Sequence, residues 1–272
     1  MENSPEYLYH YTNIETLALI LANHTFRLTS LDQMDDLQEK EAFDLKNAGQ
    51  FCYVSSWTDD ERESIPMWNM YANIEAGVRI KMKANPFQRQ KTFVANLLKA
   101  GHNVVGDLNA ELDTLISLEE MISKNYYVAE SFGGDILKKV EYTDDQNFLY
   151  PVIDHSDEQK IKLEISSLGI YKNSHWSFQR EWRYRMSIFP FNFESSEVMD
   201  IPFNTIVNNI YHGLEKQVFQ YYDLAIDDEA YTQMEVTLSP KITAGNRELI
   251  RSTILRYNPQ ITVENSCLLG LI

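Results

Sequence analysis

The sequence predicts an α+β fold, because short strands and helices follow one another without the regular strand–helix period of a parallel α/β sheet. Residues 7–12, 51–56 and 182–188 are rich in aromatic and β-branched side chains, which is typical of strands. No internal repeat and no linker rich in Pro, Gly or Ser interrupts the chain, so we expect a single domain over residues 1–272. Within it, the poorly patterned residues 101–131 are a candidate helical insertion.

The other elements follow from hydrophobic spacing and capping residues. Asn13 can cap a helix over residues 14–23, in which Leu17, Ile20 and Leu21 form an apolar stripe. Further strands are predicted at residues 26–29, 77–82, 136–142, 235–238 and 260–263. Further helical segments are predicted at residues 32–46 (together with a loop), 67–71, 86–99, 108–123, 157–168 and 246–256.

Composition and charge exclude several classes of protein. The 272 residues include 40 acidic and 24 basic side chains, a net charge of −16, so non-specific binding to nucleic acid is not expected. No stretch approaches the roughly 18 apolar residues of a membrane helix, and the first residues lack a signal-peptide core. Cys52 and Cys267 have neither zinc-ligand nor disulfide spacing and are expected to be buried free thiols. We therefore expect a cytoplasmic protein without membrane contact.

Common catalytic and metal-binding motifs are missing from the sequence. There is no phosphate-binding or dinucleotide-binding glycine loop, no nucleophile elbow and no H-E-x-x-H pair, and the six histidines are scattered. One acidic cluster could bind a hard cation, although a polar start of a helix is the commoner reason for such a cluster. Its members are Asp32, Asp35, Asp36, Glu39 and Glu41. We therefore predict no metal.

The first candidate motif is the strand segment Tyr9-His10-Tyr11-Thr12. Side chains alternate along a strand, so His10 and Thr12 are expected on one face. A His beside a Thr hydroxyl can bind a ribose or an amide at the floor of a pocket. The alternative interpretation is a His at the edge of the core that bonds to the backbone.

The second candidate motif lies in the segment 176–185, which holds three arginines. Gln179, Glu181 and Arg183 share one face if the strand extends back to residue 179. A carboxylate beside guanidinium groups stays ionised, and a fixed carboxylate stabilises the oxocarbenium-like ribose formed when a glycosidic C–N bond breaks. The alternative is a surface ladder of Glu and Arg, which contributes little.

Together these segments resemble the ADP-ribosyltransferases. Gln179-Arg180-Glu181 is similar to the E/Q-x-E strand of that superfamily, and residues 10–17 are similar to the opening H-x-T-x-x-x-x-L of its DarT-like, DNA-modifying branch. The resemblance implies a split, mixed or antiparallel β-sheet core with flanking helices. It further implies that NAD is the substrate, that Glu181 is catalytic and that Gln179 assists the acceptor.

The resemblance also implies which residues bind NAD. His10, Tyr11 and Thr12 belong to the motif that contacts NAD, and Ser55 or Ser56 takes the place of the Ser or Thr that supports the nicotinamide ribose. The remaining cofactor-binding candidates are aromatic side chains able to stack on a base and the Arg nearest the catalytic Glu. They are Trp68, Tyr71 and Arg183.

Most of the chain also resembles the bacterial family called domain of unknown function 2971. One difference lies after the second strand, where Met34-Asp35-Asp36 replaces the family's usual N-D-P. The shared features are Y-H-Y-T at residues 9–12, a strand with Cys and Ser at 52–55, W-x-x-Y at 68–71, Gly-Val at 77–78, the strand from Trp to Arg at 176–183, and the closing segment 263–266.

The leading hypothesis is therefore an NAD-dependent mono-ADP-ribosyltransferase, such as a toxin or phage-defence effector with a neutralising partner protein. Its acceptor is an unknown macromolecule or small molecule. The alternatives are an NAD glycohydrolase, in which water replaces the acceptor, and a non-catalytic module that binds or senses a nucleotide. A metal-dependent nuclease that combines the acidic cluster with Glu181 is disfavoured, because Arg183 stands where the nuclease motif needs Lys.

Overall fold

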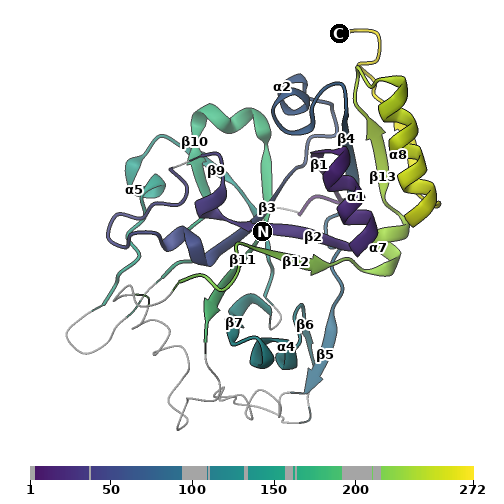
Figure 1. The fold of residues 1–272 in the computed structure, drawn as a ribbon. Coiled ribbons are helices and arrows are strands. Elements are labelled where there is room, and N and C mark those ends of the chain that lie inside the picture. The colour runs from purple at the N-terminus through teal and green to yellow at the C-terminus, as the bar shows by residue number, and fades with distance from the viewer. Residues whose placement is uncertain are drawn as a thin grey trace.

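A ten-stranded mixed β-sheet forms the centre of the computed structural model (Figure 1), which describes residues 4–36, 38–93, 109, 111–131, 134–156, 162, 164–191, 210 and 216–272. Seven of its strands follow the order β12-β2-β3-β1-β4-β13-β14, and β11 pairs with β3, β7 and β8. All pairs in this sheet are antiparallel except β13–β14. The strands are β1 (Tyr7–Asn13), β2 (Thr25–Ser30), β3 (Cys52–Thr58), β4 (Gly77–Lys83), β7 (Tyr126–Val128), β8 (Leu137–Lys139), β11 (Glu181–Pro190), β12 (Tyr221–Ala225), β13 (Glu235–Leu238) and β14 (Thr262–Asn265).

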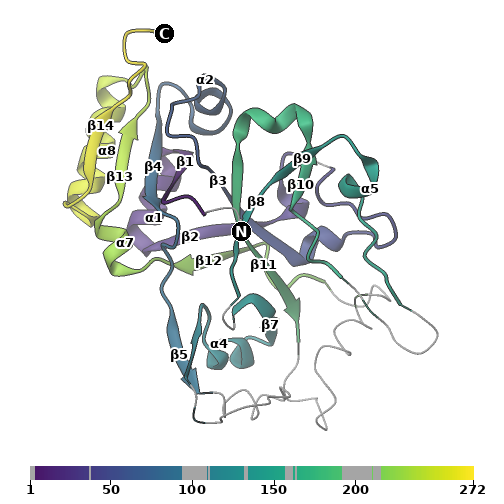
Figure 2. The same ribbon diagram turned by 180° about the vertical axis from the view of Figure 1, so that it is seen from behind.

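Helices flank this sheet, and two small sheets extend it. α1 and α8 lie side by side near β13 (Figure 2). The helices are α1 (Ile14–Asn23), α2 (Ile65–Met67), α4 (Leu118–Ser123), α5 (Gln146–Leu149), α7 (Asp228–Thr232) and α8 (Ala244–Tyr257), with 3-10 turns η1 (Leu31–Gln33), η2 (Ala48–Phe51), η4 (Ala129–Ser131) and η5 (Ser174–Gln179) and the π-helical turn η3 (Trp68–Ala72). The small sheets are the antiparallel pair β5 (Gln90–Phe93) and β6 (Glu111–Thr114) and the parallel pair β9 (Glu141–Thr143) and β10 (Tyr171–Asn173). The α+β prediction is confirmed.

Local sequence explains the first elements. Asn13 accepts a hydrogen bond from the Thr16 backbone N–H at 2.8 Å, which caps α1 as predicted. Leu17 and Leu21 are fully buried and pack in a core with the strand residues Leu8 and Ile80. Burial of such side chains is the main favourable contribution to folding, at about 1.5–3 kcal/mol each.

The sheet opens along β3, and this opening positions the site. On one edge, β3 pairs with β11 over its whole length. On the other edge it pairs with β2 at Tyr53 and Val54 and with β1 at Thr58. Within the described chain, residues 55–57 therefore have no partner strand on that edge and face a gap between β1 and β2.

Several predicted helices are wrong in the described residues. Residues 90–93 and 111–114 pair as the strands β5 and β6, so the predicted helices 86–99 and 108–123 are wrong at these residues, while α4 confirms a helix at residues 118–123. Residues 94–99, 108 and 110 of the two predicted helices lie outside the described residues. In the segment 32–46 the described residues form the end of η1 and turns, with no α-helix. The described part of the predicted helix 157–168, residues 162 and 164–168, is also non-helical. In the candidate insertion, residues 101–108 and 110 lie outside the described residues, and the others include β6, α4, β7 and η4 with the turns that join them.

Two expectations drawn from composition can be compared with the structure. Cys52 is buried as expected, whereas Cys267 is exposed, because the segment that holds it runs along the surface after β14. Among the described residues, none of the helices combines the length and the apolar character that a membrane crossing requires.

Candidate active site

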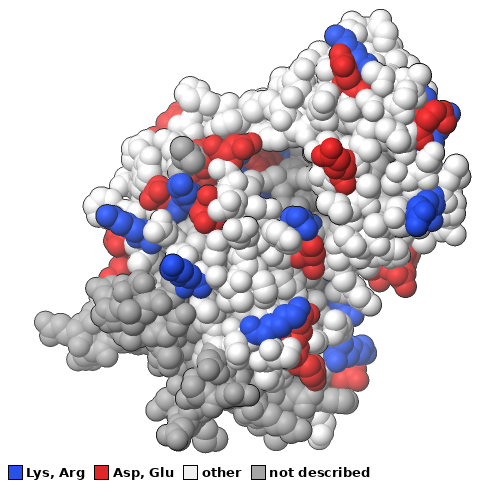
Figure 3. Space-filling view, in the orientation of Figure 1, with Lys and Arg blue, Asp and Glu red and all other residues white. Residues whose placement is uncertain are grey.

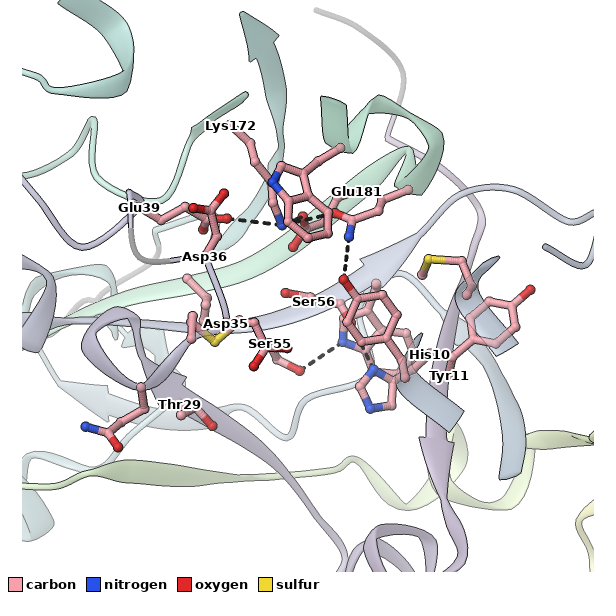
Figure 4. A pocket seen from close by; sticks show the side chains of 18 of the residues that line it. His10, Tyr11, Thr29, Asp35, Asp36, Glu39, Ser55, Ser56, Lys172 and Glu181 are labelled. Atoms are coloured by element: carbon pink, nitrogen blue, oxygen red, sulfur yellow. Dashed lines mark hydrogen bonds and ion pairs between the residues drawn. The ribbon is translucent and has the colours of Figure 1, made fainter. Parts of the chain in front are cut away.

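A cavity of about 330 Å³ lies at the opening of the sheet. Its walls come from β1, β2, β3, the segment 33–39, the helical residues 67–71, and the junction of η5 with β11. A hollow bordered by acidic and basic side chains is visible in the surface view (Figure 3). In the close view, Glu39, Lys172 and Glu181 lie along one wall, and Ser55, Ser56 and His10 lie opposite (Figure 4).

The cavity brings together most of the predicted site residues, which come from distant parts of the sequence. Those that line it are His10, Tyr11, Ser55, Ser56, Tyr71, Gln179 and Glu181. Three others, Thr12, Trp68 and Arg183, do not line it and are buried behind its walls. The expectation that Thr12 joins His10 at the pocket floor is therefore wrong.

His10 bridges the gap in the sheet. Its Nδ1 lies 2.9 Å from the backbone carbonyl oxygen of Ser56, so Nδ1 must donate the proton. Burial lowers the pKa of His10, and the bond to Ser56 offsets this only in part. The ring is therefore neutral and leaves Nε2 as a hydrogen-bond acceptor. Its centroid lies 5.0 Å from that of the Trp57 ring, which fixes its plane.

The two aromatic side chains of the helical residues 67–71 have different roles. Trp68 is fully buried, packs edge-on against Tyr11 at 5.0 Å and donates its indole N–H to Glu63 at 2.9 Å. It supports the wall and cannot stack on a ligand. Tyr71 lines the cavity, and its hydroxyl accepts a hydrogen bond from Gln179 Nε2 at 2.5 Å. Burial, followed by the charge of Glu181, raises the pKa of Tyr71 to about 12, so the hydroxyl stays protonated.

Gln179 reaches the cavity in a way that the sequence did not predict. It ends the 3-10 turn η5 instead of belonging to β11, because Arg180 adopts a left-handed backbone conformation (φ 46°) between them. Its side chain nevertheless lies beside Glu181, since Lys172 Nζ donates to Gln179 Oε1 at 3.0 Å and to Glu181 Oε2 at 3.1 Å. Gln179 and Glu181 therefore both accept a hydrogen bond from the Lys172 ammonium.

Glu181 begins β11 and is ionised. Arg183 Nε donates to Glu181 Oε1 at 2.6 Å, and the backbone N–H of Glu181 donates to the Tyr142 hydroxyl at 2.8 Å. Burial alone would raise the pKa of Glu181, but the charges of Arg183 and Lys172 outweigh it and lower the pKa to about 2.

The sequence did not reveal Glu39 and Lys172 as members of the site. Lys172 Nζ lies 3.1 Å from Glu39 Oε1, and Arg183 Nη1 lies 2.6 Å from Glu39 Oε2. Two carboxylates and two cations therefore form a closed, buried ring of ion pairs, called here the charge ring: Glu39, Lys172, Glu181 and Arg183. The ring carries no net charge. In the sequence, Glu39 stands out only as a member of the acidic cluster at residues 32–41.

The basic segment 180–185 does not present free positive charge. Arg180 pairs with Asp59 at 2.8 Å, Arg183 belongs to the charge ring, and Arg185 pairs with Glu130 at 3.0 Å. At the mouth of the cavity, Arg27 is held by Asp223. A ligand here is therefore recognised by hydrogen bonds and ring contacts more than by a positive field. Among the described residues, no group of three or more His, Cys, Asp or Glu side chains is arranged to hold a metal ion.

Part of this site lies in a segment that matches a known family model. Residues 67–184 match the model of a family described as a protein of unknown function, DUF2971. This segment is therefore similar to the DUF2971 family. The DUF2971 match includes Tyr71, Lys172, Gln179 and Glu181, whereas His10, the two serines of β3 and the segment 33–39 lie before it. Comparison with curated proteins and with solved structures finds no significant match.

Proposed function

We propose that the protein is an NAD-dependent mono-ADP-ribosyltransferase of the cytoplasm. One observation supports this most directly. The three separate segments that resemble the transferase motifs, at His10, at Ser55-Ser56 and at Gln179-Glu181, line one cavity, although more than a hundred residues separate the last from the others. A cavity of about 330 Å³ is in the range of small-molecule sites.

The chemistry assigned to this cavity is substitution at C1′ of the nicotinamide ribose. The C1′–N bond breaks, its electron pair leaves with neutral nicotinamide, and the ribose becomes an oxocarbenium-like cation. A nucleophilic atom of the acceptor bonds to C1′ and releases its proton. Glu181 is ionised and fixed at the cavity wall, so its carboxylate can stabilise the cation without first losing a proton.

Neighbouring groups define the remaining roles. Gln179 holds its amide between Lys172 and Tyr71, which leaves it well placed to orient an acceptor beside Glu181. The neutral His10 offers Nε2 as an acceptor for a ribose hydroxyl. Trp176 presents an indole ring at the cavity wall, 4.8 Å from the Lys172 ammonium, and can stack on the nicotinamide ring.

A second candidate function follows from the state of Glu181. Both of its oxygens already accept bonds from cations, and the side chain is only 4 % exposed. A carboxylate bound in this way suits a module that binds a nucleotide without reaction as well as it suits an enzyme. NAD hydrolysis, with water as acceptor, is a third outcome of the same site. A toxin or phage-defence role with a neutralising partner protein would follow from transfer to a cellular acceptor.

The test is nicotinamide release from NAD by the wild type, Glu181→Gln and the control Glu264→Gln, each with and without cell lysate. Glu264 is exposed on β14 and does not line the cavity, so its substitution removes one negative charge elsewhere. We expect Glu181→Gln to lower the rate by at least about 100-fold and the control to match the wild type. Release that requires lysate indicates transfer, and release in buffer indicates hydrolysis. NAD binding without release in any mixture would support the binding module and refute the enzyme.

A further inference from the structure

A second, smaller cavity lies beside the first, on the side of α1. Its volume is about 100 Å³, and its walls come mainly from α1 and β2. Three residues, His10, Arg27 and Ser55, line both cavities. His10 and Ser55 border the gap that opens between β1 and β2, so the two cavities meet at this gap.

The lining of the smaller cavity fits a flat heterocycle with polar edges. Phe26 and Ile20 supply apolar surface. Thr16 and Asn23, both on α1, supply a hydroxyl and an amide that can donate and accept hydrogen bonds. Purine bases combine apolar faces with a donor and acceptor edge, and sites for them combine the same two kinds of side chain.

Arg27 stands where the two cavities meet and can contact a phosphate. Its Nε and Nη2 donate to the two carboxylate oxygens of Asp223 at 2.8 and 3.0 Å, and its guanidinium lies 3.5 Å from the centroid of the Tyr221 ring. These contacts fix the guanidinium plane and use two of its five N–H donors, so further donors remain for a ligand. Asp223 neutralises the charge, so a phosphate would gain hydrogen bonds here but little net attraction.

We propose that the smaller cavity is the second compartment of the nucleotide site, binding the purine base of a dinucleotide whose phosphates cross the gap at Arg27. The reacting half occupies the larger cavity beside Glu181, and His10 Nε2 faces the sugars at the junction. This inference rests on the proposed function, because NAD supplies the second nucleotide half. Binding of AMP alone tests it separately, since AMP lacks the nicotinamide and cannot react.

The first experiment measures affinity by calorimetry for AMP, NAD and nicotinamide mononucleotide, using the wild type, Thr16→Phe and the control Thr262→Phe. A phenyl ring at residue 16 fills the smaller cavity from α1, whereas Thr262 is exposed on β14 and lines neither cavity. We expect Thr16→Phe to weaken AMP and NAD binding at least about tenfold, with a much smaller effect on nicotinamide mononucleotide, and the control to match the wild type.

A second variant tests the phosphate contact and changes little volume. Asp223→Asn keeps an oxygen for the Arg27 Nε–H but removes the negative charge, so AMP should bind about three- to fivefold more tightly, with a smaller change for adenosine. If AMP does not bind the wild type, or binds Thr16→Phe equally well, the inference is overturned. Nicotinamide release remains the separate test of the reaction, so active enzyme with no AMP site refutes only the inference.

Discussion

The charge ring allows a sharp test of whether balance between buried charges stabilises the fold. Glu39→Gln removes one carboxylate but keeps the size of the side chain, and Lys172→Met removes one cation. The side chains of Glu39 and Lys172 are only 2 % and 7 % exposed. Each single substitution leaves the ring with an uncompensated charge, whereas the double variant restores neutrality with Glu181 and Arg183 still paired.

The expected magnitude follows from burial. Removing one partner of a buried ion pair costs about 3–5 kcal/mol, because the remaining charge stays desolvated. We expect each single variant to lose about this much in the free energy of unfolding. The double variant should lose at least about 2 kcal/mol less than the sum of the two singles, because it leaves no unpaired charge.

Urea unfolding monitored by Trp fluorescence measures these free energies by linear extrapolation. The control is Glu248→Gln, which breaks an exposed pair with Arg251 at 3.6 Å on α8 and should change stability by less than about 1 kcal/mol. Additive losses in the double variant, within about 0.5 kcal/mol, would refute the argument. They would mean that Glu39 and Lys172 stabilise the protein independently and that the ring is not a unit.

Three further predictions concern pH, packing and the C-terminal segment. The lowered pKa of Glu181, about 2, means that its contribution to stability is complete above the usual carboxyl pKa near 4.5 and is lost as the pH falls toward 2. The shift corresponds to about 3 kcal/mol, so acid unfolding curves should be less steep for Glu181→Gln, and equal slopes would contradict the charge assignment. Gly77→Ala should destabilise by at least about 2 kcal/mol in thermal or urea unfolding, because its Cβ would overlap the Ala72 carbonyl oxygen; a neutral effect would mean that η3 moves freely. Glu63→Ala should speed proteolysis after β14, because Glu63 accepts the Cys267 backbone N–H at 2.7 Å; unchanged cleavage would show that other contacts hold this segment.

The sequence predicts elements well where the decisive interactions are local. The helix 14–23 is confirmed because its cap, Asn13, and its apolar stripe lie within a few turns. The strands 51–56 and 182–188 are confirmed because their side chains favour the pleated backbone, and they pair with each other as β3 and β11.

Prediction failed where distant residues determine the backbone. In the segment 157–168, the carbonyl oxygens of Ile165 and Leu168 accept hydrogen bonds from Arg185 at 2.5 and 2.7 Å. These contacts hold residues 165–168 against β11 and compete with a helix. Residues 90–93 pair with 111–114, a partner that periodicity alone does not show.

The candidate site was predictable only in part, for the same reason. Glu181 and His10 could be selected because short patterns surround them. Glu39 and Lys172 have no such pattern, since their significance comes from ion pairs that join residues 39, 172, 181 and 183. A buried charge has no local signature unless its partner is close in sequence.

The charge ring is also an argument about function. A buried ion-pair network contributes little more to stability than well-packed apolar side chains of similar size, and often less. Folding alone therefore gives no reason to place Glu39, Lys172 and Glu181 at the wall of a cavity, with Arg183 buried behind it. What the ring does provide is a low pKa for Glu181, about 2, so that its carboxylate stays ionised above this pH. The ion pairs also hold the carboxylate in one orientation, beside a cavity large enough for a ligand. A fixed negative charge of this kind is useful where positive charge develops during a reaction, and this is why the ring favours the transferase over a purely structural role.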